Sequence, residues 1–172
     1  MTHEIQLPPH KDCFVCGTPD DARIDIRYFW RDETHDIRAE VTFGPRAQGP
    51  PLHAHGGAIA AVLDEAMGTC AWMNGHMVVA VNIDVDYRRM VPLGYPLDLR
   101  CAVTRVEGRK VFAHGDLRTH DGEIVAESEG IFVVVGAEKM QGLVPGVLED
   151  IGAFERYQRM REAQVRRAAR ED

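Results

Sequence analysis

The sequence predicts an α+β fold in which one antiparallel sheet curls round a single buried helix. A glycine-marked helix start at residues 52–57 opens an apolar run that continues to Met73. Two strand-like segments precede this helix, and several more follow it with short turns between them. With 172 residues, 45% of them hydrophobic, the chain is long enough for one domain with a substantial core.

The expected strands cover residues 24–30, 36–43, 77–88, 97–106, 111–119 and 124–135. A hairpin turn at 31–35 joins the first two strands. Residues 44–51 hold two glycines and three prolines, so we expect an irregular loop there that forms part of a pocket wall. In the strand after the helix, alternation predicts one face with Val79, Val81, Ile83, Val85 and Tyr87, and a second face with Asn82, Asp84, Asp86 and Arg88.

Charge and hydropathy exclude some classes of function. The formal net charge of −7 argues against nonspecific binding to nucleic acid or to an anionic membrane. The chain lacks the roughly 20 continuous apolar residues of a membrane span, and residues 1–12 lack the apolar core of a secretory signal. We therefore expect a cytoplasmic protein. The few cysteines suit reduced thiols better than a disulfide framework.

The two ends of the chain carry patterns of their own. Cys13 and Cys16 have the spacing of half a zinc site or of a redox pair, but a structural zinc needs four ligands and the chain has no second such pair. We expect no metal and an ordered turn at 13–20. Six arginines between Arg156 and Arg170 mark a helical tail, expected to be solvated, with contact to a phosphate-bearing ligand or a partner as the alternative. The predicted parts are therefore an N-terminal segment (1–23), the sheet-and-helix domain (24–136) and the tail (137–172).

Two carboxylates, Asp64 and Glu65, interrupt the apolar helix, and burying an acid costs several kcal/mol unless a partner compensates it. Either one of these acids forms a structural hydrogen bond or ion pair, or one of them takes part in catalysis. His55-Gly56-Gly57 at the helix start favours chemistry, because glycines allow close approach and first-turn amides stabilise a developing oxyanion. Asp64 follows His55 by about two and a half turns, too far to share one reacting atom unless a second subunit or an extended substrate completes the site.

These features resemble the hotdog-fold acyl-CoA thioesterases of the phenylacetate-pathway type, and most closely the human thioesterase superfamily members related to the carboxyl-terminal modulator protein. The likeness runs from Gln48 to Val135 and is carried by HGGAIA at 55–60, DYRR at 86–89 and VEGRK at 106–110. It implies a hotdog fold and hydrolysis of a fatty or aryl acyl-CoA to free acid and coenzyme A without a cofactor. It also implies a homodimer with the active site at the subunit interface, and leaves a homotetramer, as a dimer of dimers, open.

The same resemblance assigns roles to the residues at the helix start. Gly56 N–H would polarise the thioester carbonyl, and Asp64 of the neighbouring subunit would act as base or nucleophile, with Glu65 as its rival. His55 and Gly57 complete the candidate catalytic set, although His55 would also serve as a purely structural residue. The candidate substrate contacts are Gln48, Asn82, Asp86, Arg88, Arg109 and Lys110, in which the cationic groups suit the coenzyme A phosphates.

Two positions depart from the family pattern. Gly49 stands where many relatives have a polar side chain six residues before the histidine, and Ala80 stands where some have a water-positioning hydroxyl. A noncatalytic acyl-CoA-binding sensor or interaction protein that uses the same groove is the alternative function. A hydratase or dehydratase would need an Asp and His constellation at the helix start that this sequence lacks.

Overall fold

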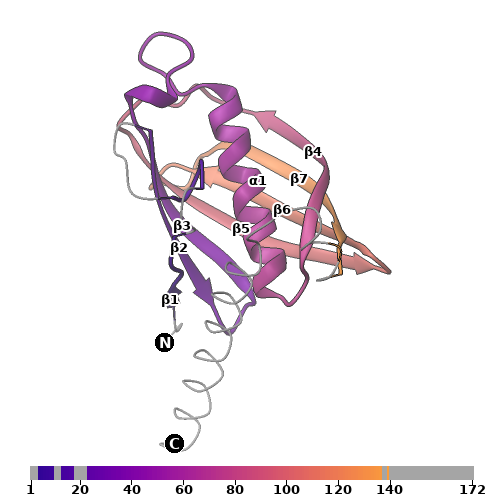
Figure 1. Cartoon of the computed structure of the whole chain (residues 1–172). Coiled ribbons are helices and arrows are strands. Elements are labelled where there is room, and N and C mark those ends of the chain that lie inside the picture. The colour runs from indigo at the N-terminus through magenta and orange to yellow at the C-terminus, as the bar shows by residue number, and fades with distance from the viewer. Residues whose placement is uncertain (1–3, 10–12, 18–22, 137–138, 140–172) are drawn as a thin grey trace, which may run out of the picture. The chain divides into compact units, whose positions relative to one another are not determined.

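The computed structural model describes residues 4–9, 13–17, 23–136 and 139 (Figure 1). By its internal contacts the chain divides into two units, Met1–Val134 and Val135–Asp172. The first unit contains the sheet and the helix. The predicted C-terminal helical tail lies outside the described residues, and the domain boundaries predicted from the sequence stay predictions.

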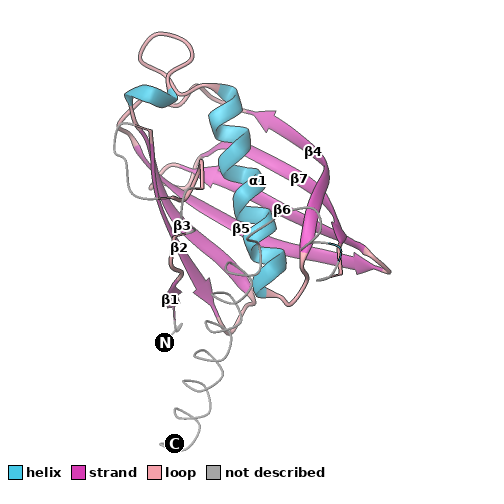
Figure 2. Cartoon of the chain, viewed as in Figure 1, coloured by secondary structure: helices cyan, strands magenta, loops and turns pink. Residues whose placement is uncertain are grey.

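The described residues form one antiparallel sheet of seven strands in the order β1-β2-β3-β5-β6-β7-β4. The strands are β1 (Glu4–Gln6), β2 (Ile24–Arg31), β3 (Asp36–Phe43), β4 (Val78–Tyr87), β5 (Pro96–Glu107), β6 (Lys110–Arg118) and β7 (Ile124–Val134). The sheet curves round the helix α1 (Gly56–Met73), as Figures 1 and 2 show. The predicted α+β hotdog arrangement is thus confirmed, and the short β1 is the strand that the sequence pattern did not predict.

One face of α1 forms the centre of the core. Side chains at three-and-four spacing, such as Val62, Leu63 and Met67, are fully buried, and α1 contacts β4, β5, β6 and β7. A second strip along the helix, which includes Ala60, Asp64 and Gly68, is only half-buried. This strip is less buried because a single sheet covers only one side of a helix.

The helix approaches the sheet closely where the strands carry glycine. A Cβ at Gly130 of β7 would lie 2.6 Å from the ring of Phe132 and 3.0 Å from the sulfur of Met67. A Cβ at Gly115 of β6 would lie 3.4 Å from Leu63. The side chains of the helix thus occupy the volume that larger strand residues would need.

Strand β4 is a free edge of the sheet in the described residues, and it contains a bulge between Ala80 and Asn82. The bulge inserts one extra residue and reverses which face the preceding side chains occupy. Val79 pairs with Val133, whereas Ile83 pairs with Gly130, three residues away on β7. Residues an odd number apart on a strand point to opposite faces, so the prediction that Val79 and Ile83 share a face is wrong.

The loop between β3 and α1 is less irregular than predicted, because it contains a short 3-10 helix, η1 (Pro45–Ala47). Proline at the first helical position favours this turn. An N–H at that position has no intrahelical partner, so proline loses no hydrogen bond there. Among the described residues, no helix is both long and apolar enough to cross a membrane. The cytoplasmic location stays a prediction.

Gly130→Ala should lower the free energy of unfolding by about 1–3 kcal/mol, because the added methyl group overlaps buried Phe132 and Met67. Gly68→Ala is the matched control, since its Cβ would meet Phe132 at an ordinary 3.8 Å and alanine favours the helix. Urea unfolding of both variants measures the difference. Equal stability of the two variants would contradict this packing.

Candidate active site

The start of α1 is held in place by backbone hydrogen bonds from two loops. His55 N–H donates to the Ala47 carbonyl oxygen at 2.7 Å, and Ala54 N–H donates to the Val91 carbonyl oxygen at 2.8 Å. The end of η1 and the loop after β4 therefore both fix the residues that lead into the helix. This rigid support is what a site at a helix start requires.

Gly49 packs directly against the backbone of His55. A Cβ at this position would lie 2.8 Å from the His55 Cα atom, so a side chain here would displace the helix start. This contact gives a physical reason for the departure from the family pattern. The neighbouring Gln48 side chain is exposed and accepts a hydrogen bond from Leu52 N–H at 3.2 Å.

His55 is the N-cap of α1, with extended backbone angles φ −68° and ψ 135°. Its Nδ1 accepts a hydrogen bond from Gly57 N–H at 2.8 Å, which leaves Nε2 to carry the proton of the neutral ring. The Gly57 amide is thereby satisfied inside the chain. The Gly56 amide, in contrast, donates to no acceptor in the part of the chain that the structure describes. The open amide of the helix start is thus that of Gly56.

Tyr87, the last residue of β4, lies against Gly56. Its hydroxyl donates to the Gly56 carbonyl oxygen at 2.9 Å, and a Cβ on Gly56 would lie 3.4 Å from its ring. Sequence reasoning assigned Tyr87 to a strand face and not to the site, although it belongs to one of the motifs that carry the family resemblance. This contact locks the helix start to the end of β4.

Asp64 is half-buried on the strip of α1 that the sheet leaves uncovered. Burial, and then the charge of Glu65, raise the pKa of its carboxyl group. The structure shows no hydrogen bond or ion pair between the Asp64 carboxylate and another described residue. Eight helical residues separate it from Gly56, or about 12 Å along the axis, so one copy of the chain cannot bring both to the same atom.

Glu65, the rival acid, is engaged elsewhere. Its Oε1 accepts a hydrogen bond from the Cys16 thiol at 3.3 Å. The predicted N-terminal turn is present at Cys13–Gly17, and Thr18–Asp20 lie outside the described residues. Hydrogen bonding by Cys16, through its side chain and then its amide, lowers the pKa of Cys13 to about 6.

A pocket of about 270 Å³ lies beside the helix start. It is lined by Phe14, Arg23, Ile24, Arg46, Ala47, Gln48, His55, Gly57 and Ala58. The loop at 44–51 contributes to its wall, as predicted from the sequence. The described part of the lining includes two arginines, and the nearby helix N-terminus adds positive potential. Sequence reasoning missed Arg23 and Arg46, which have no motif of their own.

Within one chain, the other predicted substrate contacts do not come together. Lys110 pairs with Val133 of β7, whereas Asp86 pairs with Glu127 of the same strand. Six residues of β7 separate these positions, or about 20 Å. Arg109 lies next to Lys110 at the first of these positions, where its guanidinium donates to the Val134 carbonyl oxygen at 3.0 Å.

Around the end of β4 the surface is acidic. Arg88 forms an ion pair with Glu127 at 2.5 Å. Asp86 lines a second pocket of about 220 Å³, together with Asp84, His114, Glu127, Ser128 and Glu129. Asn82 is exposed on β4, just after the bulge. On a single chain, this end of the strand offers little to a phosphate.

Comparison with known proteins shows which family this domain resembles. Residues 53–126 match the model of the thioesterase superfamily. Acyl-coenzyme A thioesterase THEM4 of Xenopus laevis is 36% identical over 91 residues, which cover 52% of this chain and 41% of that protein. The match thus spans less than half of the length of this curated relative.

Solved structures agree with this result. The crystal structure of RHA08564, a thioesterase superfamily protein, has 34% sequence identity and a TM-score of 0.60, with 63% of this chain and 53% of that chain covered. BH2602 of Bacillus halodurans, solved with CoA, has 26% identity and a TM-score of 0.52, with 57% and 66% covered. The resemblance predicted from the sequence is therefore confirmed: residues 53–126 match the thioesterase superfamily model, and the fold is similar to that of a solved member of this superfamily.

Proposed function

We propose that this protein is an acyl-CoA thioesterase, which hydrolyses a fatty or aryl acyl-CoA to the free acid and coenzyme A. Two observations carry the proposal together: the Gly56 amide is open, and the Asp64 carboxylate is half-buried. Neither group has a hydrogen-bond partner among the described residues. The names of the relatives, acyl-coenzyme A thioesterases, support the same reaction. No observation favours the noncatalytic acyl-CoA sensor.

The reaction needs one group that stabilises the negative charge on the thioester oxygen and one group that activates water or attacks the carbonyl carbon. Gly56 N–H and the helix dipole stabilise the negative charge on the thioester oxygen. Asp64 accepts a proton from the attacking water, or attacks the carbonyl carbon itself and is freed by water afterwards. The carbon–sulfur bond then breaks, the electron pair leaves with the coenzyme A sulfur, and this thiolate takes up a proton.

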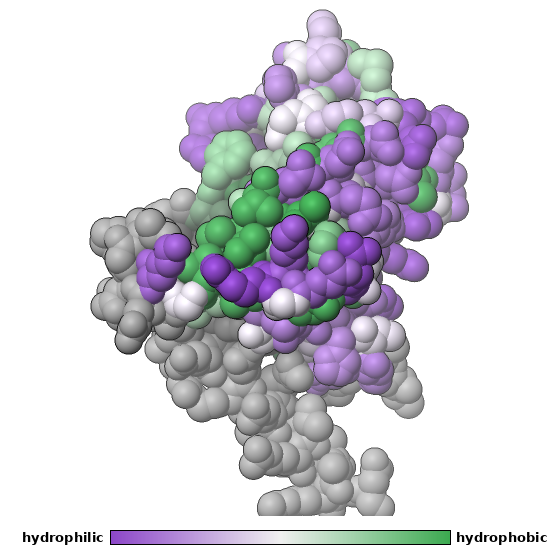
Figure 3. Space-filling model, turned by 90° about the vertical axis from the view of Figure 1, so that its right-hand side faces the viewer, coloured by the Kyte–Doolittle hydropathy of each residue, from purple (hydrophilic) through white to green (hydrophobic). Residues whose placement is uncertain are grey.

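A second copy of the chain completes the site in this proposal. Among the described residues, no strand pairs with the outer side of β4, and its Val79 and Val81 side chains are 40% and 57% exposed. Figure 3 looks onto this side of the molecule and shows hydrophobic residues gathered there. Such an edge favours antiparallel pairing with the same strand of a second copy about a two-fold axis. Whether two dimers associate further stays a prediction.

Antiparallel pairing would reverse the second copy along the strand. Its helix start would move toward Asp64 of the first copy, which brings together the amide and acid that one chain holds about 12 Å apart. Its Arg109 and Lys110 would likewise move toward the end of β4 that carries Asp86 and Arg88. We assign the coenzyme A phosphates to these cationic groups and to the arginine-lined pocket, which Gln48 also borders.

Asp64→Asn should reduce turnover by about 100- to 10,000-fold, because the amide cannot accept the proton. Release of free thiol from a panel of acyl-CoA substrates measures this loss, with thermal unfolding as the control for folding. Turnover by the wild-type protein on no acyl chain length would favour the sensor instead. Full activity of the variant would exclude Asp64 as base or nucleophile.

Gly56→Pro should remove the amide proton while leaving the helix start in place. Proline is favoured at the first helical position, and the extended backbone of His55 suits a residue before proline. We expect kcat to fall by about 100- to 1,000-fold, as for other lost oxyanion donors. Gly56→Ala, which keeps the amide, is the matched control, and equal kcat in the two variants would remove this amide from the mechanism.

A further inference from the structure

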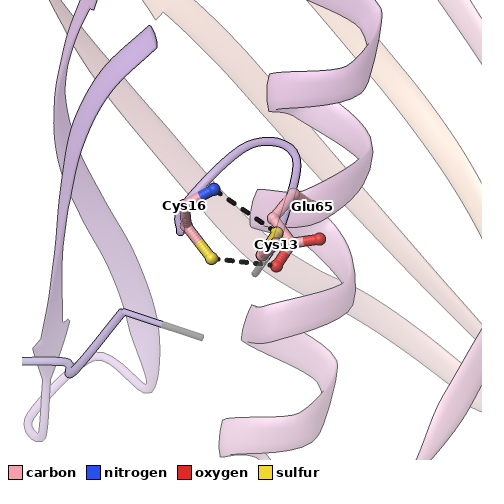
Figure 4. Close-up of side chains that lie close together, drawn as sticks. All are labelled: Cys13, Cys16 and Glu65. Carbon is pink, nitrogen blue, oxygen red and sulfur yellow. Dashed lines mark hydrogen bonds between the residues drawn. The ribbon is translucent and has the colours of Figure 1, made fainter. Parts of the chain in front are cut away.

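The turn at Cys13–Gly17 holds two sulfur atoms next to α1 (Figure 4). Cys13 Sγ accepts hydrogen bonds from the amides of Val15 and Cys16, each at 3.4 Å. Gly17 N–H closes the turn onto the Cys13 carbonyl oxygen at 3.1 Å, and a Cβ at Gly17 would overlap that oxygen. Amides directed at a sulfur atom stabilise negative charge on it, as a metal-bound thiolate requires.

Glu65 supplies a third ligand atom from the helix. Its carboxylate and the sulfur atoms of Cys13 and Cys16 all lie within 4.8 Å of one another. Zn–S bonds of about 2.3 Å and Zn–O bonds of about 2.0 Å place S and O about 3.5 Å apart in a tetrahedral site. The 3.3 Å between Cys16 Sγ and Glu65 Oε1 is close to this value.

A buried hydroxyl beside the cluster supplies an independent observation. Tyr28 is 5% exposed, and its hydroxyl has no hydrogen-bond partner. Burial, followed by the charges of Glu65, Cys16 and Cys13, raises the pKa of this tyrosine. Buried hydroxyl groups normally have a hydrogen-bond partner, so this one is available to a ligand of the cluster.

We propose that Cys13, Cys16 and Glu65 bind a zinc ion, with the fourth position open to a water molecule. On binding, both thiols lose their protons to solvent, and the two thiolates and the carboxylate bond to Zn²⁺. Paired thiolates with one carboxylate in a tetrahedral arrangement favour zinc over the oxygen-preferring magnesium and calcium. Spacing alone gave no reason to expect this site, because Glu65 is far from the cysteines in sequence.

The geometry favours a metal over a redox pair. A disulfide between Cys13 and Cys16 would remove the hydrogen bond that the Cys16 thiol donates to Glu65. A zinc ion satisfies all three groups together. It also fastens the N-terminal turn to the helical turn that carries Asp64, so the site has a structural role next to the proposed active site.

Zinc titration of the full-length, reduced protein tests the proposal, with cobalt as a spectroscopic probe. We expect one metal ion per chain and a thiolate-to-cobalt charge-transfer band. Cys13→Ser and Glu65→Gln should weaken zinc binding by more than the roughly 10- to 100-fold that loss of a ligand's hydrogen-bond partner costs. Cys70→Ser, at a buried thiol outside the cluster, is the matched control and should bind as the wild type does.

Two further measurements keep the result independent of folding and of the proposed reaction. Chelation of the loaded wild-type protein should lower its thermal midpoint, and added zinc should restore it. Asp64→Asn should keep its zinc while turnover is lost, so failure of the metal site and failure of the thioesterase proposal are distinguishable. Less than stoichiometric zinc in the reduced wild type, or unchanged affinity in Glu65→Gln, would overturn the proposal.

Discussion

A single sheet covers only one side of α1, and the character of the candidate site depends on this constraint. The covered side contributes Val62, Leu63 and Met67 to the core. The uncovered strip carries an acid between small residues, which leaves room beside the carboxylate. An acid in this position is desolvated enough for its pKa to rise, yet it has no described partner. In the proposed dimer, a second copy would supply the missing cover.

Asp64 and Glu65 are adjacent in sequence but lie about 100° apart round the helix axis, so they meet different surroundings. Glu65 reaches the Cys13–Gly17 turn, where a thiol now donates to it. Asp64 lies on the strip of α1 that the sheet leaves uncovered. Burying a carboxylate on an apolar helix costs free energy. We propose a separate role for each of the two acids: Glu65 as a metal ligand and Asp64 as the catalytic base or nucleophile. The two proposals are independent, because each uses different atoms and different tests.

The sequence predicted the fold well because the fold follows from local patterns. Alternating strands and the apolar helix are each visible in a short window, and six strands appear where they were expected. The errors have local physical causes. The bulge after Ala80 changes the face of Val79, and no pattern of hydrophobicity marks a bulge. The strand β1 is too short to show alternation.

The candidate site was predicted less completely, because spacing shows helix neighbours but not contacts between distant segments. His55, Gly56 and Asp64 share one helix, so their relation was readable. The hydrogen bond from Tyr87 to Gly56 joins residues 31 positions apart, and that from Cys16 to Glu65 spans 49 positions. The place of Arg46 in the site became apparent only from the pocket that it lines.

The central claim is that the acid of one chain acts with the helix start of another. Mixing inactive Asp64→Asn and Gly56→Pro chains, after unfolding and refolding them together, tests it most directly. In a hybrid dimer with shared sites, one of the two sites is intact, so a random equal mixture should recover about a quarter of wild-type turnover. A mixture that stays as inactive as its parents, although hybrid dimers have formed, would contradict the shared site.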